Sequence, residues 1–104
     1  MNERILVNFT PRADKHVDDA GRWWRENRTK APEAFAQDLE QALDLISTHP
    51  YIGAVARNAR LAGARRVYLA RTGHYLYYRV RGMSPQSIEV VALWHSSRSR
   101  GPRL

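Results

Sequence analysis

Hydrophobic residues recur at helical spacing in two segments of the first half of the chain. The first stripe consists of Ala13, Val17, Ala20 and Trp24, at intervals of four, three and four residues. Such spacing places apolar side chains along one side of a helix. Thr10 can cap this helix and Pro11 suits its first position, so the pattern predicts a helix that ends near Asn27 or Arg28. Gly21 inside it indicates either a weaker helix or a close approach to another element.

A second helical stripe follows a short break at residues 29–31. Its apolar members are Phe35, Leu39, Ala42, Leu43 and Ile46, and the polar residues between them, Asp38, Glu40, Gln41 and Asp44, are expected to face elsewhere. Pro32-Glu33 suits the start of this helix. His49-Pro50 ends it, because proline cannot continue a helix. The short break predicts that the two helices form an antiparallel hairpin.

Four further segments have the pattern of strands. Residues 4–9 alternate, and the runs 66–71, 74–80 and 87–95 follow one another with turns at Thr72-Gly73 and at 82–86. Short turns between consecutive strands predict antiparallel pairing. In the last run Ile88, Val90, Ala92 and Trp94 oppose Glu89, Val91, Leu93 and His95. Both sets contain apolar residues, which predicts a central strand covered on both faces.

The expected fold is therefore α+β: an N-terminal strand, an antiparallel helical hairpin, and a twisted three-stranded antiparallel meander that completes a four-stranded sheet. Residues 51–64 have no clear period and are expected to form a loop. A chain of 104 residues is long enough for one domain, so 1–104 is treated as one unit. Residues 96–104 are expected to be a loosely ordered basic tail.

Charge is divided unevenly along the chain. Residues 1–56 carry seven lysines and arginines against nine acids, a balance of −2, and residues 57–104 carry ten arginines against Glu89 alone, a balance of +9. Together they give the net charge of +7, and fifteen of the seventeen cations are arginine. Such asymmetry favours an acidic or polyanionic partner for the second half. A solvated basic surface explains the composition equally well.

Several kinds of site have no support in the sequence. Cysteine is absent, which excludes disulfides and thiolate metal sites, and the four histidines lack the spacing of a zinc site. We therefore expect no metal and no cofactor. No apolar run approaches the length of a membrane span, and the start of the chain lacks the pattern of a signal peptide. These features predict a cytoplasmic protein that does not associate with a membrane.

The order of four short motifs resembles that of one known superfamily. After the first strand and the helical hairpin come His-Pro-Tyr-Ile-Gly at 49–53, Arg-Arg-Val-Tyr-Leu at 65–69, Gly-His-Tyr-Leu-Tyr-Tyr-Arg-Val at 73–80 and Trp-His-Ser-Ser-Arg at 94–98. Over residues 4–98 this pattern resembles the ParE/RelE superfamily of type II toxin–antitoxin toxins. The resemblance implies two helices packed on a twisted antiparallel sheet. It also implies an acidic, partly disordered antitoxin that folds as it wraps the toxin in a hetero-oligomer.

Two branches of this superfamily differ in their target. RelE-like toxins cut messenger RNA on the ribosome, and ParE-like toxins inhibit DNA gyrase by binding it. The resemblance implies that a RelE-like toxin has two cations on the strand after the hairpin, an arginine after the Gly-aromatic turn, and a C-terminal arginine followed by a tyrosine. Here Arg66 is accompanied by Tyr68, Tyr75 replaces the arginine, and no tyrosine follows Arg98. These departures favour a ParE-like toxin without catalytic residues.

One alternative is a RelE-like, metal-independent endoribonuclease that uses Arg66, His95 and Arg98 as cations and proton-transfer group. The simpler interpretation of His95 is a histidine at a strand end that bonds a neighbouring backbone group. A degenerate member that only binds its antitoxin is a third possibility.

Aromatic and basic residues are the candidates for partner binding. They are Trp23, Arg57, Arg60, Arg65, Arg66, Tyr75, Tyr77, Arg79, Arg98 and Arg100. Of the paired tryptophans, Trp24 follows the apolar stripe, so Trp23 is expected to be exposed. Tyr78 shares the Leu76 side of its strand and is expected to face the core, whereas Tyr75 and Tyr77 are expected to be more open.

Overall fold

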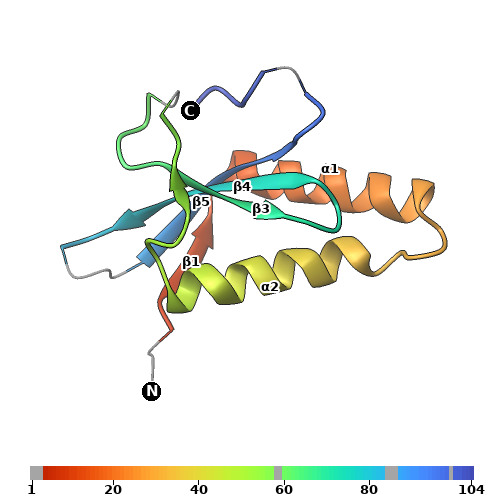
Figure 1. Cartoon of the computed structure of the whole chain (residues 1–104), viewed down its shortest axis with the longest axis horizontal. Helices are drawn as coiled ribbons and strands as arrows, with labels where there is room; N and C mark the ends of the chain where they lie inside the picture. Colours follow the sequence, from red (N-terminus) through yellow and green to blue (C-terminus); the bar gives the residue numbers. More distant parts are fainter. Residues whose placement is uncertain (1–3, 58–59, 84–86, 99) are drawn as a thin grey trace.

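Two helices cover one face of a five-stranded sheet in the structure, a computed structural model that describes residues 4–57, 60–83, 87–98 and 100–104 (Figure 1). The elements are β1 (Leu6–Phe9), α1 (Pro11–Asn27), α2 (Ala34–Thr48), β2 (Ala54–Val55), β3 (Arg65–Leu69), β4 (His74–Arg81) and β5 (Ser87–His95). The strand order is β1-β5-β4-β3-β2. β1 runs parallel to β5, and the other neighbouring strands are antiparallel. The α+β class, the hairpin and the central position of β5 were predicted correctly.

The prediction of four strands was wrong. β2 lies within the segment expected to be a loop, where Ala54 pairs with Arg66 and Val55 pairs with Arg65. A strand of two residues is too short to show a period of two, so the sequence pattern does not reveal it.

Both helices end close to the expected positions. The Thr10 hydroxyl accepts a hydrogen bond from the Ala13 backbone N–H at 3.1 Å, which caps α1. Gly21 is buried where α1 meets α2, and a Cβ atom added there would lie 3.6 Å from the Phe35 ring. Gly21 therefore marks a close approach of the two helices.

No helix in the described part of the chain is long and apolar enough to cross a membrane.

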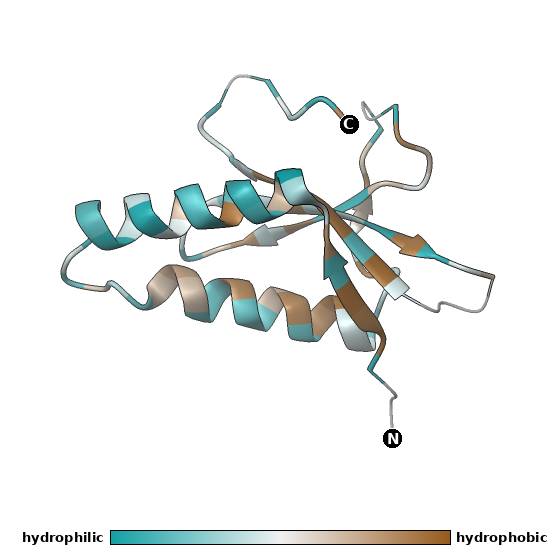
Figure 2. Ribbon diagram, turned by 180° about the vertical axis from the view of Figure 1, so that it is seen from behind, coloured by the Kyte–Doolittle hydropathy of each residue, from teal (hydrophilic) through white to brown (hydrophobic). Residues whose placement is uncertain are grey.

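The main core lies between the helices and the sheet. Its buried residues are Ala13, Phe35, Ala42, Ile46, Leu69, Leu76, Tyr78, Ile88, Val90 and Leu93. All members of the two predicted helical stripes belong to this core or pack against it. In Figure 2 most of α1 is hydrophilic, while α2 and the strands carry more of the hydrophobic residues. The predicted inward orientation of Tyr78 is also confirmed, since its side chain is fully buried.

A bulge changes the expected faces of β5. Tyr77 pairs with Ala92 and Tyr78 pairs with Val90, so Val91 has no partner on β4. Val91 and Ala92 consequently belong to a small cluster on the far face, while Leu93 joins the main core. The predicted strict alternation of β5 was therefore wrong from Ala92 onward. An extra residue in one strand shifts every later side chain to the other face.

Asp38 is a second correction, because it does not face away from the core. Its carboxylate is buried and accepts hydrogen bonds from the Thr72 backbone N–H and the Thr72 hydroxyl, both at 3.1 Å. A buried carboxylate is tolerated when such donors satisfy it. The two bonds fix the β3–β4 turn to α2.

The chain after β5 folds back over the face of the sheet that the helices leave free. Leu104 packs against the small cluster formed by Tyr77, Val91 and Ala92. The Leu104 carbonyl accepts a hydrogen bond from the Arg60 backbone N–H at 3.2 Å. The described ends of this segment and of the β2–β3 connection therefore lie beside each other above the sheet (Figure 1).

Candidate functional site

The sheet face opposite the helices carries a row of three aromatic residues, and we call it the open face. Tyr68 of β3 lies directly opposite Tyr75 of β4, which in turn lies opposite Trp94 of β5. The Tyr68 and Tyr75 rings are 5.0 Å apart between centroids, and Tyr68 is 52% exposed. Because the register aligns three adjacent strands, the row forms a continuous aromatic strip across the sheet.

Two arginines stack on this row. The Arg66 guanidinium carbon lies 4.2 Å from the centroid of the Tyr75 ring, and that of Arg98 lies 4.1 Å from Trp94. Contacts of this length are favourable cation–π interactions, which hold the guanidinium plane against the ring. The open face therefore offers flat, cationic surfaces that can grip an acidic or aromatic partner.

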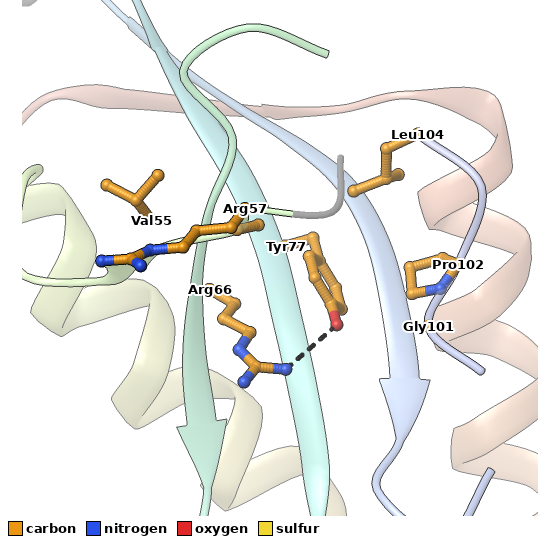
Figure 3. Close-up of a pocket in the computed structure, with 8 residues that line it drawn as sticks. Val55, Arg57, Arg66, Tyr77, Gly101, Pro102 and Leu104 are labelled. Atoms are coloured by element: carbon orange, nitrogen blue, oxygen red, sulfur yellow. Dashed lines mark hydrogen bonds between the residues drawn. The ribbon is translucent and has the colours of Figure 1, made fainter. Parts of the chain in front are cut away.

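A pocket of about 390 Å³ adjoins this row (Figure 3). Its lining residues are Val55, Ala56, Arg57, Arg66, Tyr77, Gly101, Pro102 and Leu104, none of which is acidic. Figure 3 shows Arg66 and Tyr77 side by side, and a 3.5 Å hydrogen bond joins the guanidinium to the tyrosine hydroxyl. Tyr77 is only 6% exposed, so the expectation that it is open was wrong. Val91, Ala92 and, from the returning C-terminal segment, Leu104 pack around Tyr77.

Of the three residues of the endoribonuclease alternative, His95 and Arg98 line one pocket, but Arg66 is not brought together with them. Arg66 lies on the open face. His95 lies on the helix face, where its ring meets the His74 ring at 5.0 Å, and His74 in turn meets Phe35 of the core. His95 Nδ1 accepts a hydrogen bond from the Ser97 backbone N–H at 3.1 Å, as in the simpler interpretation of this residue. A cation and a proton-transfer group on opposite faces cannot act on one phosphate.

The remaining candidates for partner binding divide into several groups. Arg57 and Arg60 are exposed in the β2–β3 connection. Arg65 instead binds the chain itself, since its guanidinium donates to the carbonyls of Tyr51 at 3.1 Å and Gly53 at 2.8 Å.

Arg79 pairs with Glu89 on the neighbouring strand at 2.8 Å. The Arg100 carbonyl accepts a hydrogen bond from the Trp94 indole. Trp23 is 49% exposed on α1, as expected, and it lies away from the open face with Arg28 stacked on it at 5.1 Å.

Two members of the aromatic row, Tyr68 and Trp94, were not among the predicted partner-binding residues. The signal that identifies them is the register across the β3–β4 and β4–β5 turns, which sets Tyr68, Tyr75 and Trp94 side by side. Register depends on turn geometry and on the bulge at Val91, and neither is visible in a hydrophobic pattern.

A second pocket, of about 770 Å³, lies between α1, the β3–β4 turn and the ends of β4 and β5. We call it the histidine cleft, because His16, His74 and His95 line it. Burial, together with the nearby His95, lowers the pKa of His74 to about 4, although the Asp38 carboxylate opposes that shift. Burial and the cations Arg12 and Arg98 also lower the pKa of His16. In the described part of the chain, no group of three or more His, Asp or Glu residues could hold a metal ion.

Solved structures with similar folds belong to toxin–antitoxin systems. The chromosomal ParDE system from P. aeruginosa aligns with a TM-score of 0.67 at 19% identity, over 88% of this chain and 96% of that chain. The RelBE2 toxin–antitoxin complex from Mycobacterium tuberculosis aligns with a TM-score of 0.62 at 22% identity, over 88% and 98%. The isolated E. coli RelE toxin aligns with a TM-score of 0.58 at 18% identity, over 92% and 88%. At these identities the likeness shows a shared fold.

The sequence itself matches one protein family. A search of curated protein sequences found no match. The family described as the ParE toxin of type II toxin–antitoxin system, parDE, matches residues 7–100, which include all strands and helices of the structure except the first residue of β1. The chain therefore belongs to the ParE toxin family of type II toxin–antitoxin systems.

Proposed function

We propose that this toxin inhibits DNA gyrase by binding it through the open face, without a chemical step of its own. The observation that carries the proposal is the separation of Arg66 on the open face from His95 on the helix face. Arg66 and Arg98 each stack on a ring of the aromatic strip, and only Arg98 also lines the pocket that contains His95. Aromatic residues and arginine are the residue types that most often dominate protein–protein interfaces.

A cognate antitoxin would neutralise the toxin in the cytoplasm. The P. aeruginosa and M. tuberculosis relatives are components of toxin–antitoxin systems, and the latter was crystallised as a complex with its antitoxin. We propose that an acidic antitoxin lays a helix and an extended segment over the α1–α2 hairpin and the edge of the sheet. The +9 balance of residues 57–104 supports an acidic partner.

A supercoiling assay tests the gyrase proposal. Purified toxin is added to gyrase and relaxed plasmid, and we expect it to prevent supercoiling. Arg66→Glu should raise the concentration needed for half inhibition about tenfold or more, because it removes a central cation of the interface. Lys30→Glu is the matched control, since it makes the same change of charge in the exposed α1–α2 connection. Equal effects of the two substitutions would contradict the proposed site.

A translation extract with primer extension separates the alternatives. We expect no cleavage of messenger RNA at codon positions. Cleavage without any effect on gyrase, abolished by His95→Ala or Arg98→Ala, would overturn the proposal in favour of an endoribonuclease. Activity in neither assay, together with tight antitoxin binding, would indicate a degenerate antitoxin-binding module.

A further inference from the structure

Most residues of the histidine cleft have no part in the proposed function, although Trp94 and Arg98 belong to the open face as well. Besides the three histidines, its lining includes all three tryptophans of the chain, Trp23, Trp24 and Trp94. It also includes three arginines, Arg28, Arg71 and Arg98. The volume of about 770 Å³ falls in the range typical of pockets for small molecules and cofactors.

The cleft favours an anionic ligand. None of its three arginines forms an ion pair within the described residues: Arg71 donates to the Gln37 side chain at 2.9 Å, and the other two stack on indoles. The one acidic residue of the lining, Asp19, is already paired with Lys15 at 3.0 Å and Arg22 at 3.7 Å. The cationic side chains therefore lack a counter-charge that a phosphate or carboxylate would supply.

The cleft also offers flat surfaces. Trp23 is half exposed, and the Arg28 guanidinium carbon lies 5.1 Å from its ring and 5.8 Å from that of Trp24. Arg98 covers Trp94 in the same way. Indole rings and guanidinium planes are the surfaces on which unpaired nucleobases stack in proteins.

Hydrogen bonds fix the tautomers of the histidines. His16 Nδ1 accepts from the Leu93 N–H and His95 Nδ1 accepts from the Ser97 N–H, both at 3.1 Å, so a neutral ring carries its proton on Nε2 in each case. Thr72 donates its hydroxyl proton to Asp38 and lies 3.0 Å from His74 Nδ1. His74 must then donate from Nδ1, which leaves a lone pair on Nε2.

This pattern of donors and acceptors suits the edge of a nucleobase better than a lone carboxylate group. His16 and His95 offer N–H donors, whereas His74 offers an acceptor. A carboxylate only accepts hydrogen bonds, so it would leave the His74 lone pair without a donor. The edge of a nucleobase presents donors and acceptors together, and its phosphate supplies the negative charge.

We propose that the histidine cleft binds a nucleotide unit, with the base against the tryptophans and histidines and the phosphate between the arginines. The ligand is a free mononucleotide or one residue of a single strand. The cleft shares Trp94 and Arg98 with the open face, whereas Trp23 and Arg71 belong to the cleft alone. Variants at Trp23 and Arg71 therefore test the proposal separately from the target of the open face.

Tryptophan fluorescence tests the proposal directly, since every tryptophan of the chain lines the cleft. The probes are adenosine monophosphate, a single-stranded oligoadenylate of about ten nucleotides, and an abasic strand of equal length. We expect saturable quenching by the oligoadenylate and binding about fivefold or more weaker for the abasic strand, because stacking contributes to affinity. Quenching by the monophosphate as well would identify a free nucleotide as ligand, and its absence would identify a strand.

Two outcomes would overturn the proposal. Equal affinity for the abasic strand would mean that the chain attracts any polyanion. Equal quenching and affinity with a decaglutamate peptide would mean that the cleft takes an acidic peptide.

Variants locate the site. Arg71 and Trp23 are exposed, so Arg71→Ala and Trp23→Ala should leave the fold intact, which circular dichroism checks. We expect Arg71→Ala to reduce the slope of log affinity against log salt for the oligoadenylate by about 0.7, the value for one phosphate contact on a single strand. Trp23→Ala should weaken binding about fivefold or more without changing that slope.

Arg81→Ala is the control, because it removes the same charge at the opposite end of β4. If Arg81→Ala matched Arg71→Ala in both affinity and slope, the proposed site would be wrong.

Discussion

Asp38, Thr72 and His74 form a buried chain of hydrogen bonds that joins α2 to the start of β4. The Asp38 carboxylate accepts both donors of Thr72, and the Thr72 hydroxyl lies 3.0 Å from His74 Nδ1. This arrangement holds His74 neutral, because burial lowers its pKa to about 4. A neutral His74 is therefore part of the folded state, and protonation must oppose folding.

The first prediction concerns the pH dependence of stability. Between its usual pKa of 6.5 and about 4, His74 takes up a proton in the unfolded chain but not in the folded one. The free energy of unfolding should consequently fall as the pH decreases through this window. The shift corresponds to about 3 kcal/mol at most, and solvent in the cleft screens the charge, so we expect about 1–2 kcal/mol.

Urea unfolding at a series of pH values measures this effect. His74→Gln is the comparison, since glutamine cannot titrate. The difference between the two proteins should depend on pH between about 6.5 and 4 and be constant above it. Parallel curves over the whole range would show that His74 does not couple folding to protons.

Tyr78 fastens the connection between α2 and β2 to the centre of the sheet. Its hydroxyl donates to the Pro50 carbonyl at 2.8 Å and accepts from the Gly53 N–H at 2.9 Å. Burial raises the pKa of Tyr78, so the hydroxyl keeps the proton that it donates. Gly53 allows this contact, because a Cβ atom there would lie 2.7 Å from the Tyr78 hydroxyl and 2.9 Å from the Arg66 carbonyl.

The second prediction follows from these two hydrogen bonds. Tyr78→Phe leaves the Pro50 carbonyl and the Gly53 N–H without their partner, and an unsatisfied buried group costs about 1–3 kcal/mol. We expect a loss of stability of that size in chemical unfolding. Tyr68→Phe is the matched control, because the described hydrogen bonds do not involve its hydroxyl and its side chain is exposed. A similar loss for both variants would contradict the role of the Tyr78 hydroxyl.

The contact between α1 and α2 depends on the size of residue 21. The atom nearest to an added Cβ is the flexible end of Arg25 at 3.3 Å, and the Phe35 ring follows at 3.6 Å. One methyl group is therefore tolerated, whereas a branched side chain would press on the Phe35 ring.

The third prediction separates these two effects. Gly21→Ala should stabilise the protein by about 0.5–1 kcal/mol, because alanine favours the helix. Gly21→Val should destabilise it by about 1–3 kcal/mol through overpacking. Thermal unfolding of both variants measures the difference. Stabilisation by both would show that the helices are not in close contact at this position.

Local patterns predicted the elements that are long enough to show a period. The helical stripes identified both helices, and Thr10, Pro11 and Pro50 placed their ends. β2 was missed because two residues have no period, and the faces of β5 were wrong after the bulge at Val91. Bulges and short strands are set by pairing with distant residues, which a single segment does not encode.

The candidate site was predicted only in part. Arg66, Tyr75 and Arg98 belong to the open face, but its aromatic strip also requires Tyr68 and Trp94, which the register aligns.

Asp38 was assigned to the surface by helical period alone, yet the β3–β4 turn folds over it and supplies donors. Such contacts depend on the tertiary structure, and a helical wheel cannot reveal them.

Across the whole molecule, the excess of positive charge lies in the second half of the sequence. Residues 57–104 carry +9, and they form β3, β4, β5 and the connections that frame the open face. A surface of one sign accelerates encounters with an oppositely charged partner, and salt weakens the effect.

The fourth prediction concerns the rate of association with gyrase. Raising salt from about 50 to about 300 mM should lower the association rate constant about tenfold or more and change the dissociation rate constant much less. Stopped-flow fluorescence measures both rates. Arg57→Ala should reduce the salt dependence more than Lys30→Ala, because Arg57 lines the open-face pocket. A dissociation rate that carries most of the salt effect would contradict electrostatic steering.

The position of β5 bears on how the toxin is made. Leu6 of β1 pairs with Ser87 of β5, and β4 pairs with the other side of the same strand. At about 5–20 residues per second, a ribosome needs roughly 4–16 s to travel between these two positions. During that time β1 has no neighbour and the main core lacks Ile88, Val90 and Leu93. The fold therefore stays incomplete until β5 has been synthesised, and a partner that captured unpaired β1 would act before the toxin has folded.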